Sequence, residues 1–219
     1  MHKKVAFIID GWYMWKRIQH LKLFEYNGPN IRNYCKKHLN FDYETFYRIF
    51  YYDTAPYDGR GHNPVSKKSV NFTTSPAAQK QNLLFDSIKK TPNFALRLGH
   101  VIWDNNRWAL KPEPQKSLLN GTITVSDLKE DDVAPIFKQK AVDMKIGLDI
   151  AYIAMKKLAD KLVIITGDAD MVPALKAARR EGMQVALDPL GQNIGPELSE
   201  HIDYLVTKTN DREYKKTEI

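Results

Sequence analysis

The sequence has few of the residues that build thiol, zinc and haem centres. Its 219 residues include one cysteine, Cys35, and six histidines that form no close pairs of the kind that bind zinc. No Gly-x-x-x-x-Gly-Lys-Ser/Thr sequence is present, which excludes a P-loop nucleotide-binding site. No stretch approaches the roughly 20 consecutive apolar residues of a membrane-spanning helix. These absences leave side-chain oxygen atoms as the main candidates for chemistry.

We expect no signal peptide, because the Met-His-Lys-Lys start runs straight into a predicted strand. We therefore expect a cytoplasmic protein with no membrane partner. With 43% hydrophobic residues, the chain can bury one good core but not two. The expected organisation is a single domain over residues 1–210, with a basic elaboration at about 53–136 and a polar C-terminal tail at 211–219.

Two short apolar runs each end in an acidic turn. Residues 5–9 are followed by Asp10, and residues 162–165 are followed by Thr-Gly-Asp-Ala-Asp, which contains Asp168 and Asp170. A helical pattern comes after each run, which is typical of a buried parallel strand leading into a crossover helix. Since such sheets bind ligands at the carboxyl ends of their strands, we expect these acids to share one edge.

A further acid, Asp143, lies in the first turn of the helix predicted near 141–159. Four clustered carboxylates would repel one another and raise their own pKa values unless a cation neutralises them. Oxygen ligands suit Mg²⁺ or Mn²⁺, which can hold a phosphodiester and orient an attacking water. Asp149 lies about 120° away from Asp143 around the helix axis, so we expect it to orient a water or a backbone group.

Helix capping is the competing explanation for several of these acids. Asp10 follows an apolar strand, where a turn or a cap would also explain it, and Asp170 stands where a helix N-cap belongs. Asp168 precedes that cap by two residues, so capping explains it less well. Asp53 is either another ligand or a turn residue, and the turn is the favoured alternative. The hydroxyl of Thr166 is a weaker candidate for holding a water or a phosphate oxygen.

Positive charge is concentrated in the middle of the chain. Residues 60–116 contain ten Lys or Arg and three acids, so this section alone carries the net charge of +7 that the whole chain has. A basic section beside an acidic rim suits an enzyme that cuts a polyanion. The aromatic residues here either stack on unpaired bases or pack in the core. The candidate RNA-binding residues are Lys67, Lys68, Arg97, Arg107, Trp108 and Lys140.

The alternation of predicted elements indicates an α/β sandwich with a mainly parallel sheet. Helices are expected near residues 12–22, 30–39, 76–90, 141–159, 171–181 and 195–201, and strands near 4–9, 45–52, 94–103, 162–166, 184–187 and 203–206. Residues 107–111 are interpreted as a hairpin partner of 94–102, with the turn at Asn105-Asn106. Residues 53–75 and 112–136 are expected to be loops, the first bordering the active site and the second carrying a solvated acidic run.

Five segments of the sequence resemble the NYN domains of the PIN-like nuclease superfamily, particularly the LabA-type group. They are Phe7-Ile8-Ile9-Asp10-Gly11-Trp12-Tyr13, Tyr51-Tyr52, Gln139-Lys140-Ala141-Val142-Asp143 with Asp149, Thr166-Gly167-Asp168-Ala169-Asp170, and Glu197-Leu198 through Asp203-Tyr204. The resemblance implies a three-layer fold of Rossmann-like type. It also implies that Asp10, Asp143, Asp168 and Asp170 are the metal-binding acids of a ribonuclease.

The chain departs from the family pattern after the Asp-Gly pair. Many members have a small residue or an acid there, often with an asparagine close behind, where this chain has Trp12 and Tyr13. The polar role of that asparagine is therefore in doubt here. Haloacid-dehalogenase-type phosphatases have a similar first-strand Asp, but they carry a second Asp where Trp12 stands, so their aspartyl-phosphate mechanism is disfavoured.

Two functional hypotheses follow. The first is a ribonuclease, expected to be an endonuclease, that uses Mg²⁺ or Mn²⁺ to hydrolyse RNA. The second is a regulatory RNA- or protein-binding module on the same fold with little or no turnover. The intact acids favour catalysis, because a pure binder gains nothing from negative charge facing RNA. A homodimer is compatible with either hypothesis.

Overall fold

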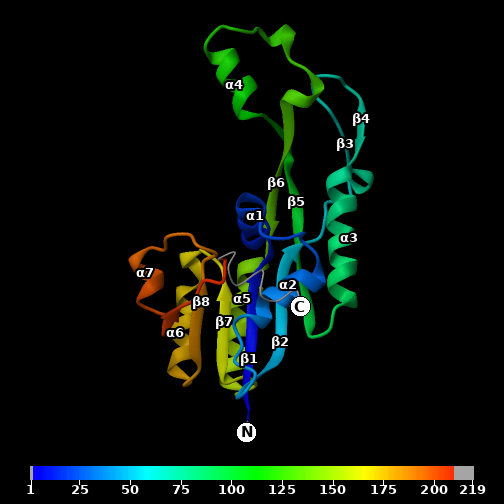
Figure 1. Cartoon of the computed structure of the whole chain (residues 1–219). Coiled ribbons are helices and arrows are strands. Elements are labelled where there is room, and N and C mark those ends of the chain that lie inside the picture. Colours follow the sequence, from blue (N-terminus) through cyan, green and yellow to red (C-terminus); the bar gives the residue numbers. More distant parts are fainter. Residues whose placement is uncertain (1, 210–219) are drawn as a thin grey trace. The chain divides into compact units, whose positions relative to one another are not determined.

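The computed structural model describes residues 2–209, which divide into two compact units (Figure 1). The first unit contains the described residues up to 53 together with 83–99 and 141–209, and the second contains 54–82 and 100–140. The predicted tail at 211–219 lies outside the described residues. None of the helices in the described part is long and apolar enough to cross a membrane.

The strands form a seven-stranded, mostly parallel sheet in the order β6-β5-β2-β1-β7-β8-β9. In the first unit β1 pairs in parallel with both β2 and β7, and β8 pairs in parallel with β7 and β9. The strands named here are β1 (Lys3–Asp10), β2 (Glu44–Thr54), β5 (Phe94–Leu110), β6 (Val133–Lys140), β7 (Lys161–Ile165), β8 (Gln184–Asp188) and β9 (Tyr204–Leu205). The predicted α/β fold class is confirmed.

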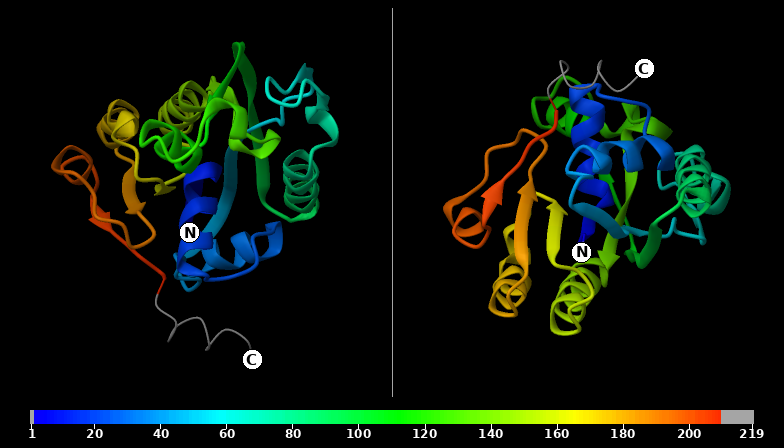
Figure 2. Two further views of the ribbon diagram at one scale, coloured as in Figure 1. Left: turned by 90° about the horizontal axis from the view of Figure 1, so that it is seen from above. Right: turned by 60° about the horizontal axis from the view of Figure 1, so that its bottom comes forward.

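Helices cover both faces of the sheet of the first unit, which makes three layers (Figure 2). Ala6 and Ile8 of β1 pack against one helical layer, whereas Val5, Phe7 and Ile9 pack against the other, because successive side chains of a strand point to opposite faces. The first layer contains α5 (Val142–Met155), α6 (Val172–Arg180) and α7 (Pro196–Ser199), and the second contains α1 (Gly11–Leu21), α2 (Gly28–Lys36) and the end of α3 (Pro76–Lys90).

A buried hydrogen-bond network ties α2 to the end of β8. Asp188 is fully buried, and its Oδ2 accepts hydrogen bonds from the Tyr34 hydroxyl at 2.6 Å and contacts Nε2 of His38 at 2.8 Å. Its Oδ1 accepts the backbone N–H of Leu190 at 2.8 Å. Since a buried carboxylate is stable only when it is fully bonded, this network makes the link between the two elements specific.

The second unit has its own aromatic cluster. Its five members have ring centroids between 5.1 and 6.3 Å from their neighbours in the cluster, distances typical of packed aromatic pairs. They are Tyr57, Phe72, Trp103, Trp108 and Phe137. The other elements of this unit are β3 (Arg60–His62), β4 (Ser69–Asn71), α4 (Pro112–Leu119) and three short 3₁₀ turns, Phe72–Thr74, Val125–Asp127 and Glu130–Asp132.

The hairpin predicted at Asn105-Asn106 is wrong. Both asparagines have the positive φ of a tight turn, 48° and 56°, but β5 continues through them along the same partner strand. The register jumps from Trp103 opposite Phe137 to Trp108 opposite Pro135, so the asparagines lie in a bulge. The true partner is β6, whose first four residues were predicted to belong to the loop at 112–136.

The buried Asp188 network gives a prediction for stability. We expect Asp188→Ala to lower the free energy of unfolding by about 3–5 kcal/mol, because it leaves the Tyr34 hydroxyl and the His38 imidazole buried without their partner. Chemical denaturation measures the change. The matched control is Asp86→Ala, which removes an exposed ion pair with Lys89 at 3.2 Å and should change stability by less than about 1 kcal/mol. Equal effects of the two changes would contradict the network's role.

Candidate active site

Asp10 ends β1 and caps α1. Its Oδ1 accepts the backbone N–H of Tyr13 at 3.0 Å, so the capping alternative is correct for this oxygen. The following Gly11 is required by space, because a Cβ there would lie 2.6 Å from the backbone oxygen of Tyr52 and from the ring of Tyr51. The Asp-Gly pair therefore lets the chain turn sharply into α1 while keeping the carboxylate at the edge of the sheet.

The parallel register brings the second acidic turn to the same edge. Ile9 pairs with Ile165, so the next residue on each strand, Asp10 and Thr166, begins the rim. Thr166 is buried, and its hydroxyl oxygen accepts the backbone N–H of Asp168 at 3.2 Å. The Thr166 side chain thus shapes the turn that presents Asp168.

The sequence interpretation of capping in this turn is wrong. Asp168, and not Asp170, is the cap, because its Oδ1 accepts the backbone N–H of Asp170 at 2.9 Å at the start of the 3₁₀ turn Ala169–Met171. The error arose because α6 begins only at Val172, after this extra turn. Asp170 is exposed, so its carboxylate is open to solvent.

Tyr13, in the first turn of α1, contacts both the loop after β7 and the loop after β8. Its hydroxyl donates to the backbone oxygen of Pro189 at 2.6 Å, and its ring lies so close to Gly167 that a Cβ there would be 2.7 Å away. Burial raises the pKa of Tyr13 to about 12, so the hydroxyl keeps its proton and remains a donor. Tyr13 therefore helps to fix the position of the turn that carries Asp168.

The fourth acid comes from α5. Ala141 adopts a left-handed conformation with φ of 69° immediately before the helix, and Asp143 lies exposed in its first turn. The positive φ lets the chain leave β6 and start the helix within one residue. Within residues 2–209 the Asp143 side chain has no protein hydrogen-bond partner, so its carboxylate is available for a ligand.

Two of the acids are affected by the negative charges of their neighbours. The pKa of Asp10 is raised, first by burial and then by the charges of Asp143 and Asp168, although the backbone N–H groups of Tyr13 and Trp12 lower it. The pKa of Asp143 is also raised, first by burial and then by the charges of Asp168 and Asp170. The structure therefore brings together the acids that the sequence predicted, and their charges oppose one another.

The carboxylate oxygens of the four acids are ligands that suit a hard divalent cation, but the acids do not surround a single point. Among residues 2–209, no group of three His, Cys, Asp or Glu side chains is placed to hold a metal ion. Mg²⁺ commonly keeps several waters and uses only one or two carboxylates, so an open set of acids is compatible with such an ion. Two features of the site suit Mg²⁺ or Mn²⁺: all its candidate ligands are oxygen atoms, and their negative charges repel one another unless a cation is bound.

Asp149 has protein partners. Its Oδ2 accepts the hydroxyl of Tyr52 at 2.7 Å and Nε of Arg97 at 3.1 Å, and the Arg97 guanidinium also lies over the ring of Phe50. Both partners are side chains, whereas the sequence predicted that Asp149 orients a water or a backbone group, so that role stays a prediction. The ion pair also engages Arg97, which was predicted to bind RNA. Asp53 is buried inside β2, so the turn interpretation is wrong for it.

The remaining predicted RNA-binding residues belong to the second unit. Lys68 pairs with Glu130 at 3.1 Å, and Arg107 pairs with the buried Asp104. Trp108 belongs to the aromatic cluster, which supports packing as one of its roles. Lys67 lies between β3 and β4, and Lys140 ends β6. Their contact with RNA stays a prediction.

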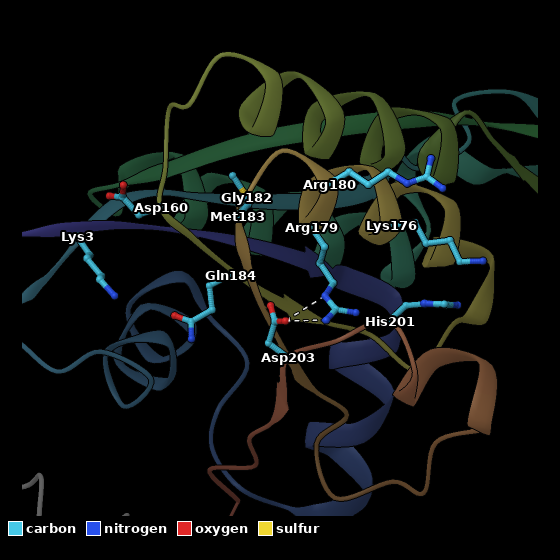
Figure 3. A pocket seen from close by; sticks show the side chains of 10 residues that line it. All are labelled: Lys3, Asp160, Lys176, Arg179, Arg180, Gly182, Met183, Gln184, His201 and Asp203. Carbon is cyan, nitrogen blue, oxygen red and sulfur yellow. Dashed lines mark hydrogen bonds and ion pairs between the residues drawn. The ribbon is translucent and has the colours of Figure 1, made fainter.

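A wide hollow of about 920 Å³ lies away from these acids (Figure 3). It is lined by Lys3, Asp160 and Gln184, which stand at or beside the starts of β1, β7 and β8, the edge opposite the acidic rim. Arg179 in this hollow is paired with Asp203 at 2.9 Å. The volume of a hollow therefore does not identify the candidate active site in this protein.

Sequence reasoning missed Asp188, although a signal was present. It follows an apolar strand as Asp10 does, and it pairs in register with Ile165 at the same edge. Its burial against Tyr34 and His38 separates it from the exposed acids, and no local pattern predicts these distant partners.

The sequence from residue 70 to 190, more than half of the chain, matches the family profile described as NYN domain. A comparison with curated proteins gave no match. Among solved structures, the crystal structure of a protein of unknown function from Vibrio parahaemolyticus RIMD 2210633 is similar, with a TM-score of 0.53 and 13% identity. The likeness covers 96% of this chain and 95% of that chain, and it shows a shared fold.

The repulsion among the acids predicts the effect of removing one charge. In EDTA at pH 7, Asp143→Asn should raise the thermal midpoint by about 1–2 °C. A carboxyl whose pKa is raised on folding opposes folding while ionised, so the gain should shrink as the pH falls toward the ordinary value of 3.8, where both states become protonated. Thermal unfolding of wild type and variant at pH 7, 5 and 4 measures this.

The matched control is Asp86→Asn, which removes one exposed charge elsewhere in the first unit. It should not raise the midpoint, because Asp86 has Lys89 beside it. Added Mn²⁺ should stabilise wild type more than Asp143→Asn, since the ion offsets the repulsion. A variant that is no more stable than wild type at pH 7 would show that the charges are not in conflict.

Proposed function

Because the chain belongs to the NYN domain family, we propose that it is a metal-dependent ribonuclease that cuts RNA phosphodiester bonds internally. Members of this family have a PIN-like fold and are typically nucleases. The observation that carries the proposal is that acids gather at one edge of the sheet, where the charges of Asp143 and Asp168 raise the pKa of Asp10, and those of Asp168 and Asp170 raise the pKa of Asp143. A site built only for binding RNA would not place like charges of this sign together.

We further propose that the chain is of the LabA-like group. The supporting features are the Asp-Gly turn after β1 and the Thr-Gly-Asp-Ala-Asp turn after β7. The matched residues 70–190 include Asp143, Asp168 and Asp170 but not Asp10. The role of Asp10 is supported instead by the register of β1 with β7 and by its coupling to the other acids.

Mg²⁺ or Mn²⁺ would be held among Asp10, Asp143, Asp168 and Asp170, by one or two of the carboxylates at a time, with waters completing the coordination. When bound, the ion supplies positive charge beside the scissile phosphate. The chain's own residues hold this arrangement in place. Tyr13 and Thr166 position the turn that carries Asp168, and the exposed Asp143 and Asp170 face solvent, from which an attacking water would come.

The basic section of the chain at residues 60–116, which contains parts of both units, is proposed to bind the RNA backbone, because it carries a net charge of +7. The candidates remain Lys67, Lys68, Arg107, Trp108 and Lys140 of the second unit, together with Arg97 of the first. The single domain over residues 1–210 with an elaboration at about 53–136, and a homodimer, also stay predictions.

The decisive experiment compares cleavage of labelled single-stranded RNA and matched DNA with Mn²⁺, Mg²⁺ or EDTA. In the double variant Asp168→Asn, Asp170→Asn, we expect metal-dependent RNA cleavage to fall on the order of 100-fold or more. Asparagine can still accept the capping hydrogen bond, so the turn should persist. Thermal unfolding checks that the variant is folded.

The matched control is Asp160→Asn, which removes a carboxylate charge at the opposite edge of the sheet and should leave cleavage unchanged. Equal losses in the two variants would show that the assay does not report on the acidic rim. RNA binding by wild type without any cutting, kept or strengthened in the double variant, would reject the ribonuclease in favour of a binding module.

A further inference from the structure

Two exposed tryptophans stand next to the proposed catalytic acids. Helix α1 starts immediately after Asp10, and its buried side packs Met14 and Ile18 into the core. The opposite side carries Trp12 and Trp15, which are 51% and 40% exposed. Residues three apart on a helix are neighbours, so the two rings share one face.

The two indole rings form a flat surface. Their centroids are 5.0 Å apart and their planes differ by only 21°, so they are stacked. The Lys16 ammonium group lies 5.8 Å from the centroid of Trp12. Exposed apolar side chains are normal when they are scattered singly, but two large rings side by side on a solvent face indicate a binding surface.

The residues near the two tryptophans in sequence are basic, which favours a negatively charged ligand. No Asp or Glu occurs from residue 11 to residue 24, whereas Lys16, Arg17 and Lys22 are all basic. Arg17 donates to the backbone oxygen of Leu190 at 2.9 Å, so its charge is held close to the turn after β8. Aromatic rings beside cations suit a ligand that has flat rings and negative charge, as a single-stranded nucleic acid has.

The tryptophan pair lies close to Asp10 in the chain, so a nucleotide bound there would be near the proposed catalytic acids. Trp12 is two residues from Asp10, and its backbone N–H interacts with that carboxylate. A base held on Trp12 would place its own phosphate group near the acidic rim, and Trp15 lies about one turn further along the helix.

We infer that Trp12 and Trp15 form a stacking platform for unpaired bases of single-stranded RNA, with Lys16 contacting the backbone phosphate. This inference rests on the proposed function and adds a substrate preference to it. A paired duplex cannot offer a base face to the platform, so the protein should prefer unpaired RNA at this position.

The test measures binding in EDTA, so that cutting does not interfere. The ligands are a labelled oligouridylate about a dozen nucleotides long, a duplex of equal length, and an abasic strand with the same number of phosphates. Removing both rings in Trp12→Ala, Trp15→Ala should weaken oligouridylate binding by about 10- to 100-fold. Binding of the abasic strand should change little, since it has no bases to stack.

Two further variants separate stacking from other effects. Trp12→Phe, Trp15→Phe keeps aromatic faces and should recover most of the binding. The matched control is Phe41→Ala, Tyr43→Ala, which removes two aromatic side chains that are 56% and 53% exposed just before the start of β2, at the opposite edge of the sheet. This control should bind oligouridylate as wild type does.

The outcomes distinguish this inference from the proposed function. Wild type that binds oligouridylate through the tryptophans but does not cut RNA would reject the ribonuclease and keep the platform. Wild type that cuts RNA, with a tryptophan double variant that binds like wild type, would overturn the platform and keep the ribonuclease. A double variant that changes only the oligomeric state would also overturn it, because the rings would then contact a second copy of the chain.

Discussion

The parallel register of β1 with β7 is the constraint on which the candidate site depends. It makes two apolar strands end side by side, so that the turns after them, and the acids in those turns, share one edge of the sheet. At Asp10, burial and then the charges of Asp143 and Asp168 raise the pKa of the carboxyl group, so its ionised form is disfavoured. The strands stay in place because their side chains fill cores on both faces, so the fold holds a charge arrangement that is locally unfavourable.

Most of the first unit could be predicted because its elements are encoded by local patterns. The strand before Asp10 and the strand before Thr166 are short apolar runs, and the helices after them show helical spacing. Once the strands are parallel, chain connectivity alone brings Asp10, Asp168 and Asp170 to one edge. Asp143 was predicted for the same reason, since it opens the helix that leads into β7.

The features that sequence reasoning missed depend on partners far away in the chain. Nothing near Asp188 indicates that Tyr34 and His38 will surround it, and nothing near Pro135 indicates that β5 will continue past its bulge to pair with it. The capping error had another source. A 3₁₀ turn between Asp168 and α6 moved the cap by two residues, and propensities do not separate such a turn from the first turn of a helix.

Helix α1 shows how one segment can satisfy several requirements at once. Asp10 closes its first turn, Tyr13 reaches across to hold the neighbouring loop, and the outer face is left to Trp12 and Trp15. The hydrogen bonds of Asp10 and Tyr13 fix these two side chains, which are about one helical turn apart. The hydrophobic core fixes Met14 and Ile18 on the inner side of the helix. Folding therefore constrains the residue type least at the positions on the outer side of the helix. Trp12 and Trp15 are not among the buried core residues, and a ligand beside the acidic rim is the explanation that we infer for two exposed rings stacked on each other there.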